Sequence, residues 1–253
     1  MPATGDMRGR AALVTGAAGG IGRAAAVKLA AAGADICLVD LDPVELAAAA
    51  REIEALGVRV LICVTDIALA DSCFAAVDAA VQAFGRLDAL CNAANVFAPA
   101  RATSMARADW DRTVATNLTA PFHLMQAAIP HLLEHDGAVV NVTSCVAFMA
   151  QPYAAAYAAS KAGLTHMTKA LAMEYLDQPI RINAVAPGGM WSNTGATAKL
   201  PDDLDPKLFI KFTPSRGMVD VDQVADMIAF LASDASRGYH GACISIDNGV
   251  SLG

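Results

Sequence analysis

Tyr157 and Lys161 are four residues apart in the alanine-rich stretch PYAAAYAASK, residues 152–161. Positions i and i+4 of a helix share one face, so a helical stretch would hold the phenol close to the ammonium group. At about 4–5 Å the ammonium group contributes roughly 3–4 kcal/mol at an effective dielectric constant of 20. Before desolvation opposes it, this interaction lowers the tyrosine pKa by about two to three pH units. The pair is therefore suited to exchanging a proton with an alcohol or a carbonyl.

Two further polar side chains are candidates for the same chemistry. Ser144 follows the apolar run AVVNVT, at the end of a strand where parallel α/β sheets place their ligands, so its hydroxyl could hydrogen-bond a substrate oxygen. Asn117 lies inside the helical run TVATNLTAPF, where an amide has little intrinsic reason to be. It could hold a water or a backbone carbonyl in a proton path. Taken singly, these side chains also fit a turn serine, a buried asparagine and a surface Tyr–Lys pair.

A glycine-rich turn, TGAAGGIG at residues 15–22, follows the first apolar run and precedes a helical stretch. Glycines at 16, 20 and 22 let the backbone turn tightly and approach a pyrophosphate. The N-terminus of the following helix offers free N–H groups to the phosphates. The spacing differs from the usual Gly-x-Gly-xx-Gly fingerprint, so the prediction of nucleotide binding depends on the strand–turn–helix context.

An acidic residue, Asp40, ends the second apolar run. A carboxylate there can accept hydrogen bonds from the adenosine ribose hydroxyls, and it would repel a 2′-phosphate. The residues that follow, Leu41, Asp42 and Pro43, carry no positive charge, so NAD is favoured over NADP. The alternative is that Asp40 only starts a turn or caps the next helix. Asp66, after the third run, could contact the adenine amino group or lie in an exposed loop.

Seven short apolar runs alternate with helix-like stretches along the chain. These candidate strands are Ala11–Thr15, Asp35–Asp40, Arg59–Val64, Leu87–Cys91, Ala138–Thr143, Arg181–Ala186 and Cys243–Ile246. Several are continuously apolar, as expected of parallel strands covered on both faces. The alternation predicts one α/β domain over residues 1–253, a doubly wound (Rossmann-type) parallel sheet of about seven strands with helices on both faces. The proline-containing stretch 190–217 breaks the rhythm and is predicted to be a substrate-loop insertion.

Composition limits the function classes. The 253 residues are 55% hydrophobic and 17% charged, with a net charge of −7, which fits a well-buried α/β protein. Without a basic tract, the chain has no electrostatic footprint for a nucleic acid or an acidic membrane. Six cysteines lack CxxC spacing and predict buried reduced thiols rather than a metal site. These thiols and the absence of an apolar signal core near the N-terminus predict a cytoplasmic protein.

Two stretches without charged side chains, Thr113–Leu133 and Gly137–Ser160, are long enough to suggest membrane spans. Both contain prolines and buried-type polar residues such as Asn117 and Asn141. Buried elements of a globular protein explain them better than membrane spans do.

The motifs together resemble the short-chain dehydrogenase/reductase family, in its branch of roughly 250 residues. The family's TGxxxGxG is TGAAGGIG here, and its YxxxK is Tyr157–Lys161. Its Pro-Gly after the sixth strand is Pro187–Gly188. The resemblance implies a catalytic tetrad of Asn117, Ser144, Tyr157 and Lys161, in which Lys161 also holds the nicotinamide ribose. It further implies hydride transfer at a secondary alcohol or ketone, often in a homotetramer; a homodimer is the alternative.

The sequence departs from the family pattern at two places. The family's Asn-Asn-Ala-Gly is Cys91-Asn92-Ala93-Ala94 here. Ala94 lacks glycine's freedom, so its backbone must adopt ordinary angles, while Asn92 keeps the amide expected to tie neighbouring strands near the cofactor. The threonine usually found after Pro-Gly has Ser192 at its place, with Thr194 close by, and the sequence leaves open which one contacts the nicotinamide.

The predicted contacts extend along one continuous site. The cofactor residues are Gly16, Gly20, Ile21, Gly22, Asp40, Asp66, Ile67, Asn92, Ala93, Tyr157, Lys161, Pro187, Gly188 and Ser192. The substrate residues are Ser144, Val146, Tyr153, Tyr157, Met190 and Trp191. Because the substrate residues are mostly apolar, a hydrophobic or cyclic secondary alcohol is favoured over a highly anionic substrate.

The favoured hypothesis is an NAD-dependent dehydrogenase of a secondary alcohol. One alternative is an NADPH-dependent 3-ketoacyl-type carbonyl reductase, against which Asp40 argues. The other is a non-catalytic NAD-binding sensor, because a fold alone does not establish activity.

Overall fold

The computed structural model describes residues 5–190, 204–209 and 216–252. Its seven strands are β1 (Ala11–Thr15), β2 (Asp35–Asp40), β3 (Val60–Val64), β4 (Ala89–Asn92), β5 (Ala138–Val142), β6 (Arg181–Pro187) and β7 (Cys243–Ile246). They pair in parallel in the order β3-β2-β1-β4-β5-β6-β7. The predicted doubly wound α/β fold is confirmed. The strand order reverses between β1 and β4, where such sheets open a crevice for ligands.

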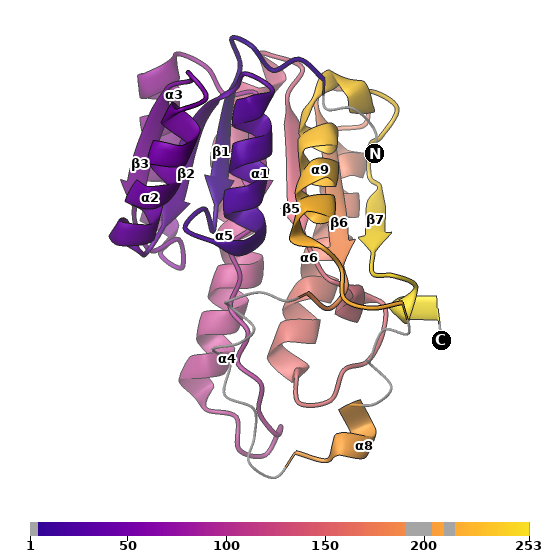
Figure 1. The fold of residues 1–253 in the computed structure, drawn as a ribbon. Coiled ribbons are helices and arrows are strands. Elements are labelled where there is room, and N and C mark those ends of the chain that lie inside the picture. The colour runs from indigo at the N-terminus through magenta and orange to yellow at the C-terminus, as the bar shows by residue number, and fades with distance from the viewer. Residues whose placement is uncertain (1–4, 191–203, 210–215, 253) are drawn as a thin grey trace.

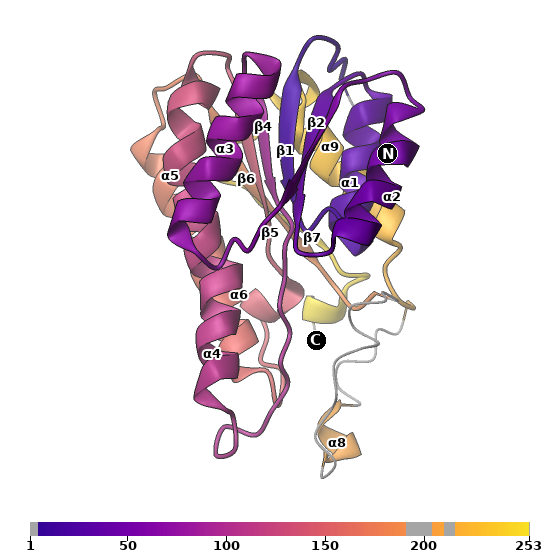
Figure 2. The ribbon, with the colours of Figure 1, turned by 90° about the vertical axis from the view of Figure 1, so that its left-hand side faces the viewer.

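Helices cover both faces of the sheet. One layer holds α1 (Gly20–Ala31), α2 (Pro43–Glu54) and α9 (Val221–Ala232), and the other holds α3 (Ala70–Phe84), α5 (Ala120–Leu133) and α6 (Ala155–Glu174). Figure 2 shows the sheet edge-on between the two layers. In Figure 1 the strands point toward the end of the molecule that carries α4 (Arg107–Val114) and α8 (Pro206–Phe209). The carboxyl ends of the strands therefore open toward these two helices.

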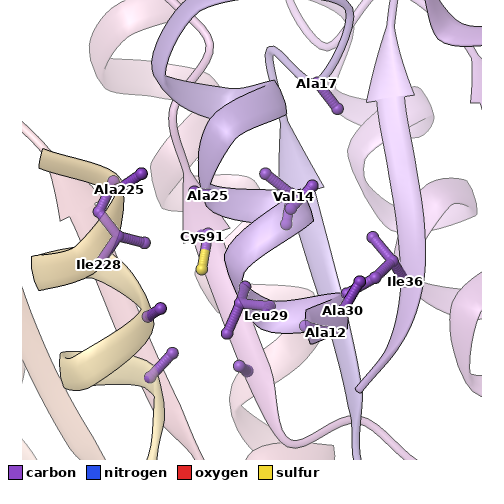
Figure 3. Close-up of a cluster of buried hydrophobic side chains, with 14 of the residues drawn as sticks. Ala12, Val14, Ala17, Ala25, Leu29, Ala30, Ile36, Cys91, Ala225 and Ile228 are labelled. Atoms are coloured by element: carbon purple, nitrogen blue, oxygen red, sulfur yellow. The ribbon is translucent and has the colours of Figure 1, made fainter. Parts of the chain in front are cut away.

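The core explains why the strands are continuously apolar. All residues of β1, β5 and β6 are buried, since helices pack on both of their faces. Figure 3 shows Val14 of β1 beside Ala25 and Leu29 of α1, with Ile228 of α9 nearby. Alanines keep the surface of α1 shallow, so α1 and α9 pack closely over the central strands.

The strand bounds agree with the sequence prediction to within two residues. β1, β2 and β7 have the predicted bounds, whereas β4 begins at Ala89 rather than at Leu87. Just before this start, the Asp88 carboxylate accepts a hydrogen bond from the Ala11 N–H at 2.9 Å. The Asp88 backbone is paired as well, because its N–H donates to the Ala11 carbonyl oxygen at 2.8 Å and its carbonyl oxygen accepts from the Ala138 N–H at 2.9 Å.

The two uncharged stretches form buried parts of this fold. Thr113–Leu133 includes the end of α4, a π-helical turn η1 (Ala115–Thr119) and α5, and Gly137–Ser160 includes β5, the short helix η2 (Cys145–Ala147) and the start of α6. Among the described residues, no helix is both long and apolar enough to cross a membrane. All six cysteines are free thiols. The described residues contain no cluster of three or more potential metal ligands.

Candidate active site

The glycine-rich turn lies at the carboxyl end of β1 and leaves no room for a side chain at Gly16 or Gly22. Gly16 has a φ of +68°, and a Cβ on Gly22 would lie 2.2 Å from the carbonyl oxygen of Gly16. Thr15 Oγ1 accepts hydrogen bonds from the N–H groups of Ala93 and Ala94, each at 3.1 Å. These bonds tie the loop after β4 beside the turn. The first turn of α1 thus borders a cavity with backbone N–H groups suited to phosphate oxygens.

A cavity of about 920 Å³ runs along the carboxyl ends of the strands. Because the strand order places β3 and β2 on one side of β1 and β5 and β6 beyond β4, the cavity has two chemically different ends. Near β2 and β3 its lining is acidic, with Asp40, Asp42, Glu45 and Asp66. Near β5 and β6 it contains Ser144, Tyr157, Lys161 and Met190.

Asp40 is tied to the glycine-rich turn rather than to the helix that follows it. Its Oδ2 accepts a hydrogen bond from the Ala18 N–H at 3.0 Å. Asp42 caps α2 instead, by accepting hydrogen bonds from two N–H groups of the first helical turn. The alternative that Asp40 caps this helix is therefore wrong. The Asp40 carboxylate lines the cavity, as an adenosine ribose contact requires.

Three of the four predicted catalytic residues meet between β5 and α6. Ser144 lies two residues after β5 and is 7% exposed. Lys161 is 1% exposed and donates a hydrogen bond from Nζ to the Val142 carbonyl oxygen at 2.9 Å. Its Nζ lies 5.7 Å from the centroid of the Tyr157 ring. The i, i+4 spacing on α6 thus brings the ammonium group and the phenol together, as predicted.

The protonation of this pair differs from the expectation drawn from spacing alone. Burial raises the pKa of Tyr157 to about 12, although hydrogen bonding with Ser144 acts in the opposite direction. Burial also lowers the pKa of Lys161 to about 7. The predicted lowering of the tyrosine pKa by Lys161 applied before desolvation opposes it, and desolvation is the largest influence on the pKa of Tyr157 in this structure. Lys161 is buried and Tyr157 is partly buried, and desolvation penalises the charged form of each group.

Lys161→Met is expected to increase stability most at low pH. The folded-state pKa of Lys161, about 7, lies below its usual 10.5, so the unfolded chain binds an extra proton between these values. Stability of the native protein therefore rises with pH across that window, by up to about 1.4 kcal/mol per pH unit. Below about pH 7 Lys161 is charged in the native protein, which then bears the full free-energy cost of burying that charge. Tyr157, with a pKa raised from 10 to about 12, changes stability only above about pH 10.

Urea unfolding of the native protein and Lys161→Met between about pH 6 and pH 9 measures this effect. The advantage of the variant should be greatest at the acidic end and should shrink as the pH rises. A difference that does not change with pH would mean that Lys161 titrates with its ordinary pKa.

Asn117 lies in the π-helical turn η1 and makes hydrogen bonds to residues on both sides of the site. Its Oδ1 accepts a hydrogen bond from the Val96 N–H, and its Nδ2 donates one to the Val96 carbonyl, both at 2.8 Å. Nδ2 also donates to Ser160 Oγ at 3.3 Å, and that hydroxyl donates to the Tyr157 carbonyl at 2.8 Å. Asn117 therefore joins the loop after β4 to the helix of Tyr157. Its part in a proton path stays a prediction.

The departure at Cys91-Asn92-Ala93-Ala94 is accommodated by ordinary geometry, whereas Ser192 lies outside the described residues. Ala94 is not among the described residues with positive φ, as expected for a residue with a Cβ. Asn92 Nδ2 donates to Asn141 Oδ1 at 2.8 Å, which ties β4 to β5. Asn141 Nδ2 in turn donates to Thr168 of α6 at 2.9 Å. The Asn92 side chain thus fixes the strands, whereas the neighbouring Ala93 and Ala94 line the cavity.

Most of the predicted contacts line this one cavity. They are Gly16, Gly20, Ile21, Gly22, Asp40, Asp66, Ile67, Ala93, Ser144, Val146, Tyr157, Lys161, Pro187, Gly188 and Met190. Trp191, Ser192 and Thr194 lie outside the described residues, as does most of the stretch 190–217.

Tyr153 is the exception among the described substrate residues, because it does not line the cavity. Its hydroxyl accepts a hydrogen bond from the Asp205 N–H at 3.1 Å. The Arg101 guanidinium lies 5.3 Å from the centroid of its ring. With φ at +61°, Tyr153 joins its loop to the residues before α8 instead of forming the cavity wall.

Sequence reasoning missed residues that carry no motif. Phe97 packs its ring edge-on against Tyr157 at a centroid distance of 5.0 Å. Gln151 also lines the cavity, between Ser144 and Tyr157 in the sequence. Ser160, one residue before Lys161, links Asn117 to α6. Of these three residues, only Ser160 could have been found from the sequence, because it is a polar residue beside a predicted catalytic residue in an alanine-rich helix.

Comparison with known proteins defines the class. A family model described as enoyl-(acyl carrier protein) reductase matches residues 16–251. The chain belongs to the short-chain dehydrogenase/reductase family, in agreement with its fold and motifs.

The names of the individual relatives refer to different substrates. The chain is 36% identical over 247 residues to 3-oxoacyl-(acyl-carrier-protein) reductase FabG of Thermotoga maritima, covering 97% of this chain and 99% of the relative. It is also 36% identical over 248 residues to 2,5-dichloro-2,5-cyclohexadiene-1,4-diol dehydrogenase LinX of Sphingobium indicum, covering 98% of both. A short-chain dehydrogenase from Mycobacterium paratuberculosis, solved bound to NAD, is similar in structure with a TM-score of 0.91 and 31% identity, covering 98% of this chain and 100% of that chain.

Proposed function

We propose that this protein is an NAD-dependent oxidoreductase that transfers a hydride between nicotinamide and a secondary alcohol or ketone. The observation that carries the proposal is the single cavity in which the glycine-rich turn and Asp40 lie at one end and Ser144, Tyr157 and Lys161 at the other. A dinucleotide extended along this cavity would be held at its phosphates by the N-terminus of α1 and at its reactive ring by the residues beside the phenol. The domain comprises the whole chain, with residues 190–217 as its substrate segment.

The chain's own groups handle the proton and the substrate oxygen. NAD, when bound, supplies the hydride acceptor. Tyr157 exchanges a proton with the substrate oxygen through its phenol, and Ser144 hydrogen-bonds the same oxygen. Lys161 would hold the nicotinamide ribose and, in its protonated form, would add positive charge beside the phenol. In the oxidative direction, the positive charges of Lys161 and of the oxidised cofactor both favour loss of the phenolic proton.

Asp40 supports NAD over NADP. Its carboxylate lines the cavity at the end of β2, where an adenosine ribose lies in doubly wound folds. The next residue, Leu41, is 52% exposed and brings no positive charge to that position. A 2′-phosphate would therefore face an uncompensated carboxylate.

Gly22→Ala is expected to weaken NAD binding by at least about tenfold. The new methyl group would lie 2.2 Å from the Gly16 carbonyl oxygen, so the turn that receives the phosphates must open. Gly238→Ala is the control, because a Cβ there meets nothing within 4 Å, its φ is not positive and Gly238 does not line the cavity. Calorimetric titration of both variants with NAD measures the effect. Equal affinities would exclude the turn as the phosphate site.

The cavity walls support a hydrophobic or cyclic substrate. Val96, Phe97, Val146 and Met190 supply apolar surface around the reactive groups, while Gln151 offers one further hydrogen-bonding side chain. The related LinX acts, by its name, on a cyclic diol. An apolar pocket with a few polar groups orients a ring through shape and fixes its reacting oxygen through hydrogen bonds.

Initial rates of NAD reduction with a panel of secondary alcohols test the proposal. The panel should include cyclic alcohols, cyclic diols, steroid-like alcohols and 3-hydroxyacyl thioesters, with NAD and NADP in parallel. We expect turnover of cyclic or hydrophobic alcohols with NAD. Binding of NAD with no turnover across the panel would favour the non-catalytic sensor.

A 3-ketoacyl-type carbonyl reductase is the second candidate, favoured by the 36% identity to FabG. The same panel separates it from the first candidate. Preferential turnover of 3-hydroxyacyl thioesters with NADP would establish it, against the electrostatics of Asp40.

The expected assembly and location also remain proposals. We propose a homotetramer or homodimer in the cytoplasm. Trp110 of α4 and Phe122 of α5 are 41% and 40% exposed, so this side of the molecule has apolar surface to bury against another copy. Free thiols at all six cysteines fit a reducing compartment. Light scattering during size-exclusion chromatography distinguishes these assemblies from a monomer.

A further inference from the structure

The turn after β7 packs directly against the wall of the cavity. The Gly188 N–H donates a hydrogen bond to the Ile246 carbonyl oxygen at 2.9 Å. A Cβ on Gly188 would lie 2.7 Å from the Cα of Asp247, so the two backbones touch. The position of this turn is therefore coupled to that of Pro187–Met190, which lines the cavity.

Asn248, in the same turn, holds a second piece of chain against this wall. Its Nδ2 donates hydrogen bonds to the carbonyl oxygens of Gly217 and Met218, at 2.9 Å and 3.2 Å. One side-chain amide thus fixes two consecutive backbone carbonyls. Gly217 is the last residue of the 190–217 stretch, and Met218 begins the chain that follows it.

Val219, the residue after Met218, connects this piece of chain to the cavity wall. The Val219 N–H donates to the Gly189 carbonyl oxygen at 2.8 Å, and Val219 forms a parallel β-bridge with Met190. Gly189 and Met190 line the cavity next to the reactive groups. A continuous path of hydrogen bonds therefore runs from the Asn248 amide to the wall on the β6 side.

The backbone of Asn248 explains why asparagine suits this position. Its φ is +53°, in the left-handed region that most residues avoid and asparagine tolerates. Glycine would adopt the same backbone but has no amide donors, and aspartate has the same shape but offers only acceptors. Asparagine combines the required backbone with N–H groups that face carbonyls.

We propose that Asn248 is a positioning residue that sets the substrate-facing wall formed by Gly189 and Met190. The proposal rests on the proposed oxidoreductase function. The groups that exchange the proton belong to β5 and α6, which Asn248 does not contact through any described hydrogen bond. Its loss therefore displaces a wall that contacts substrate equally in the ground state and the transition state, and such a change raises KM rather than lowering kcat.

Three variants test the role. In Asn248→Gly the backbone is relaxed and the amide is removed, so KM for the best alcohol should rise about five- to tenfold with kcat changed less than about twofold. Asn248→Asp places a carboxylate against two carbonyls, and its KM should rise further. Asp136→Gly is the matched control, because Asp136 also has a positive φ, +52°, but lies between α5 and β5, at the opposite end of the strands.

A second readout does not depend on turnover. In protein with 13C-methyl-labelled methionine, the Met190 and Met218 methyl resonances, assigned with Met→Leu variants, should shift in Asn248→Gly and stay in place in Asp136→Gly. Unchanged methyl shifts together with an unchanged KM would overturn the positioning role. If the native protein oxidises no alcohol, the proposed function fails, and the methionine shifts alone decide whether Asn248 holds the wall.

Discussion

Tyr157→Phe is expected to reduce kcat by about 10²- to 10⁴-fold, the usual contribution of a positioned general acid or base. The change removes only the hydroxyl that exchanges a proton with the substrate oxygen. The ring keeps its edge-on contact with Phe97, and Lys161 keeps its hydrogen bond to the Val142 carbonyl. NAD affinity should therefore stay within about twofold of the native value. Initial rates and calorimetric NAD titration of the same samples measure both quantities.

Tyr175→Phe is the control for this experiment. Tyr175 follows α6 at its far end and does not line the cavity, so removing its hydroxyl should leave kcat unchanged. A Tyr157→Phe protein that keeps more than about a tenth of the native kcat would exclude the phenol as the proton-exchanging group. Loss of NAD binding in the same variant would instead show that the Tyr157 hydroxyl is needed for the cofactor site.

Asp40→Asn combined with Leu41→Arg is expected to reverse the cofactor preference. A carboxylate about 4 Å from a phosphate is repelled by roughly 4 kcal/mol at an effective dielectric constant of 20, about a thousandfold in the ratio of kcat/KM values. Asparagine keeps an acceptor oxygen for the Ala18 N–H, which Asp40 binds at 3.0 Å. The introduced guanidinium would replace the half-exposed Leu41 side chain, which lines the cavity. Initial rates with NAD and NADP give the ratio.

The two single variants separate the contributions. Asp40→Asn should remove the repulsion and give comparable rates with both cofactors, whereas Leu41→Arg should add attraction while the carboxylate still opposes NADP. If the native protein already uses NADP as well as NAD, Asp40 does not select the cofactor. The ketoacyl-reductase candidate would then gain support.

The fold could be predicted in detail because its signals are local. The mostly apolar runs ICLVD and AVVNV become the largely buried strands β2 and β5, as expected of strands covered on both faces. The equally apolar run VLICV forms β3, which is only partly buried. Strand ends were less predictable. Asp88, just before β4, is bonded to Ala11 through both its side chain and its backbone, and no periodicity in the sequence indicates these bonds.

The candidate site likewise contains some residues that the sequence predicts and others that it does not. The spacing of Tyr157 and Lys161 on one helix predicts their proximity, and the glycine-rich turn predicts a phosphate site, because both depend on neighbours in the chain. Phe97 and Gln151 reach the cavity from loops without a pattern. Tyr153 could be taken for a pocket residue from its place in the sequence, but its left-handed backbone and its bond to Asp205 place it elsewhere.

The sequence by itself determined the α/β fold class and the short-chain dehydrogenase/reductase family, together with the residues available for a dinucleotide and a proton. These conclusions follow from the periodicity of the apolar residues, the spacing of the motifs and the types of residue in them. Only the tertiary structure decided how those residues are charged and held. Burial raises the pKa of Tyr157 and lowers that of Lys161, and Asn248 secures a cavity wall across 30 residues of chain. Desolvation and long-range contacts depend on the packing of segments that are remote in the chain, and residue spacing alone does not contain that information.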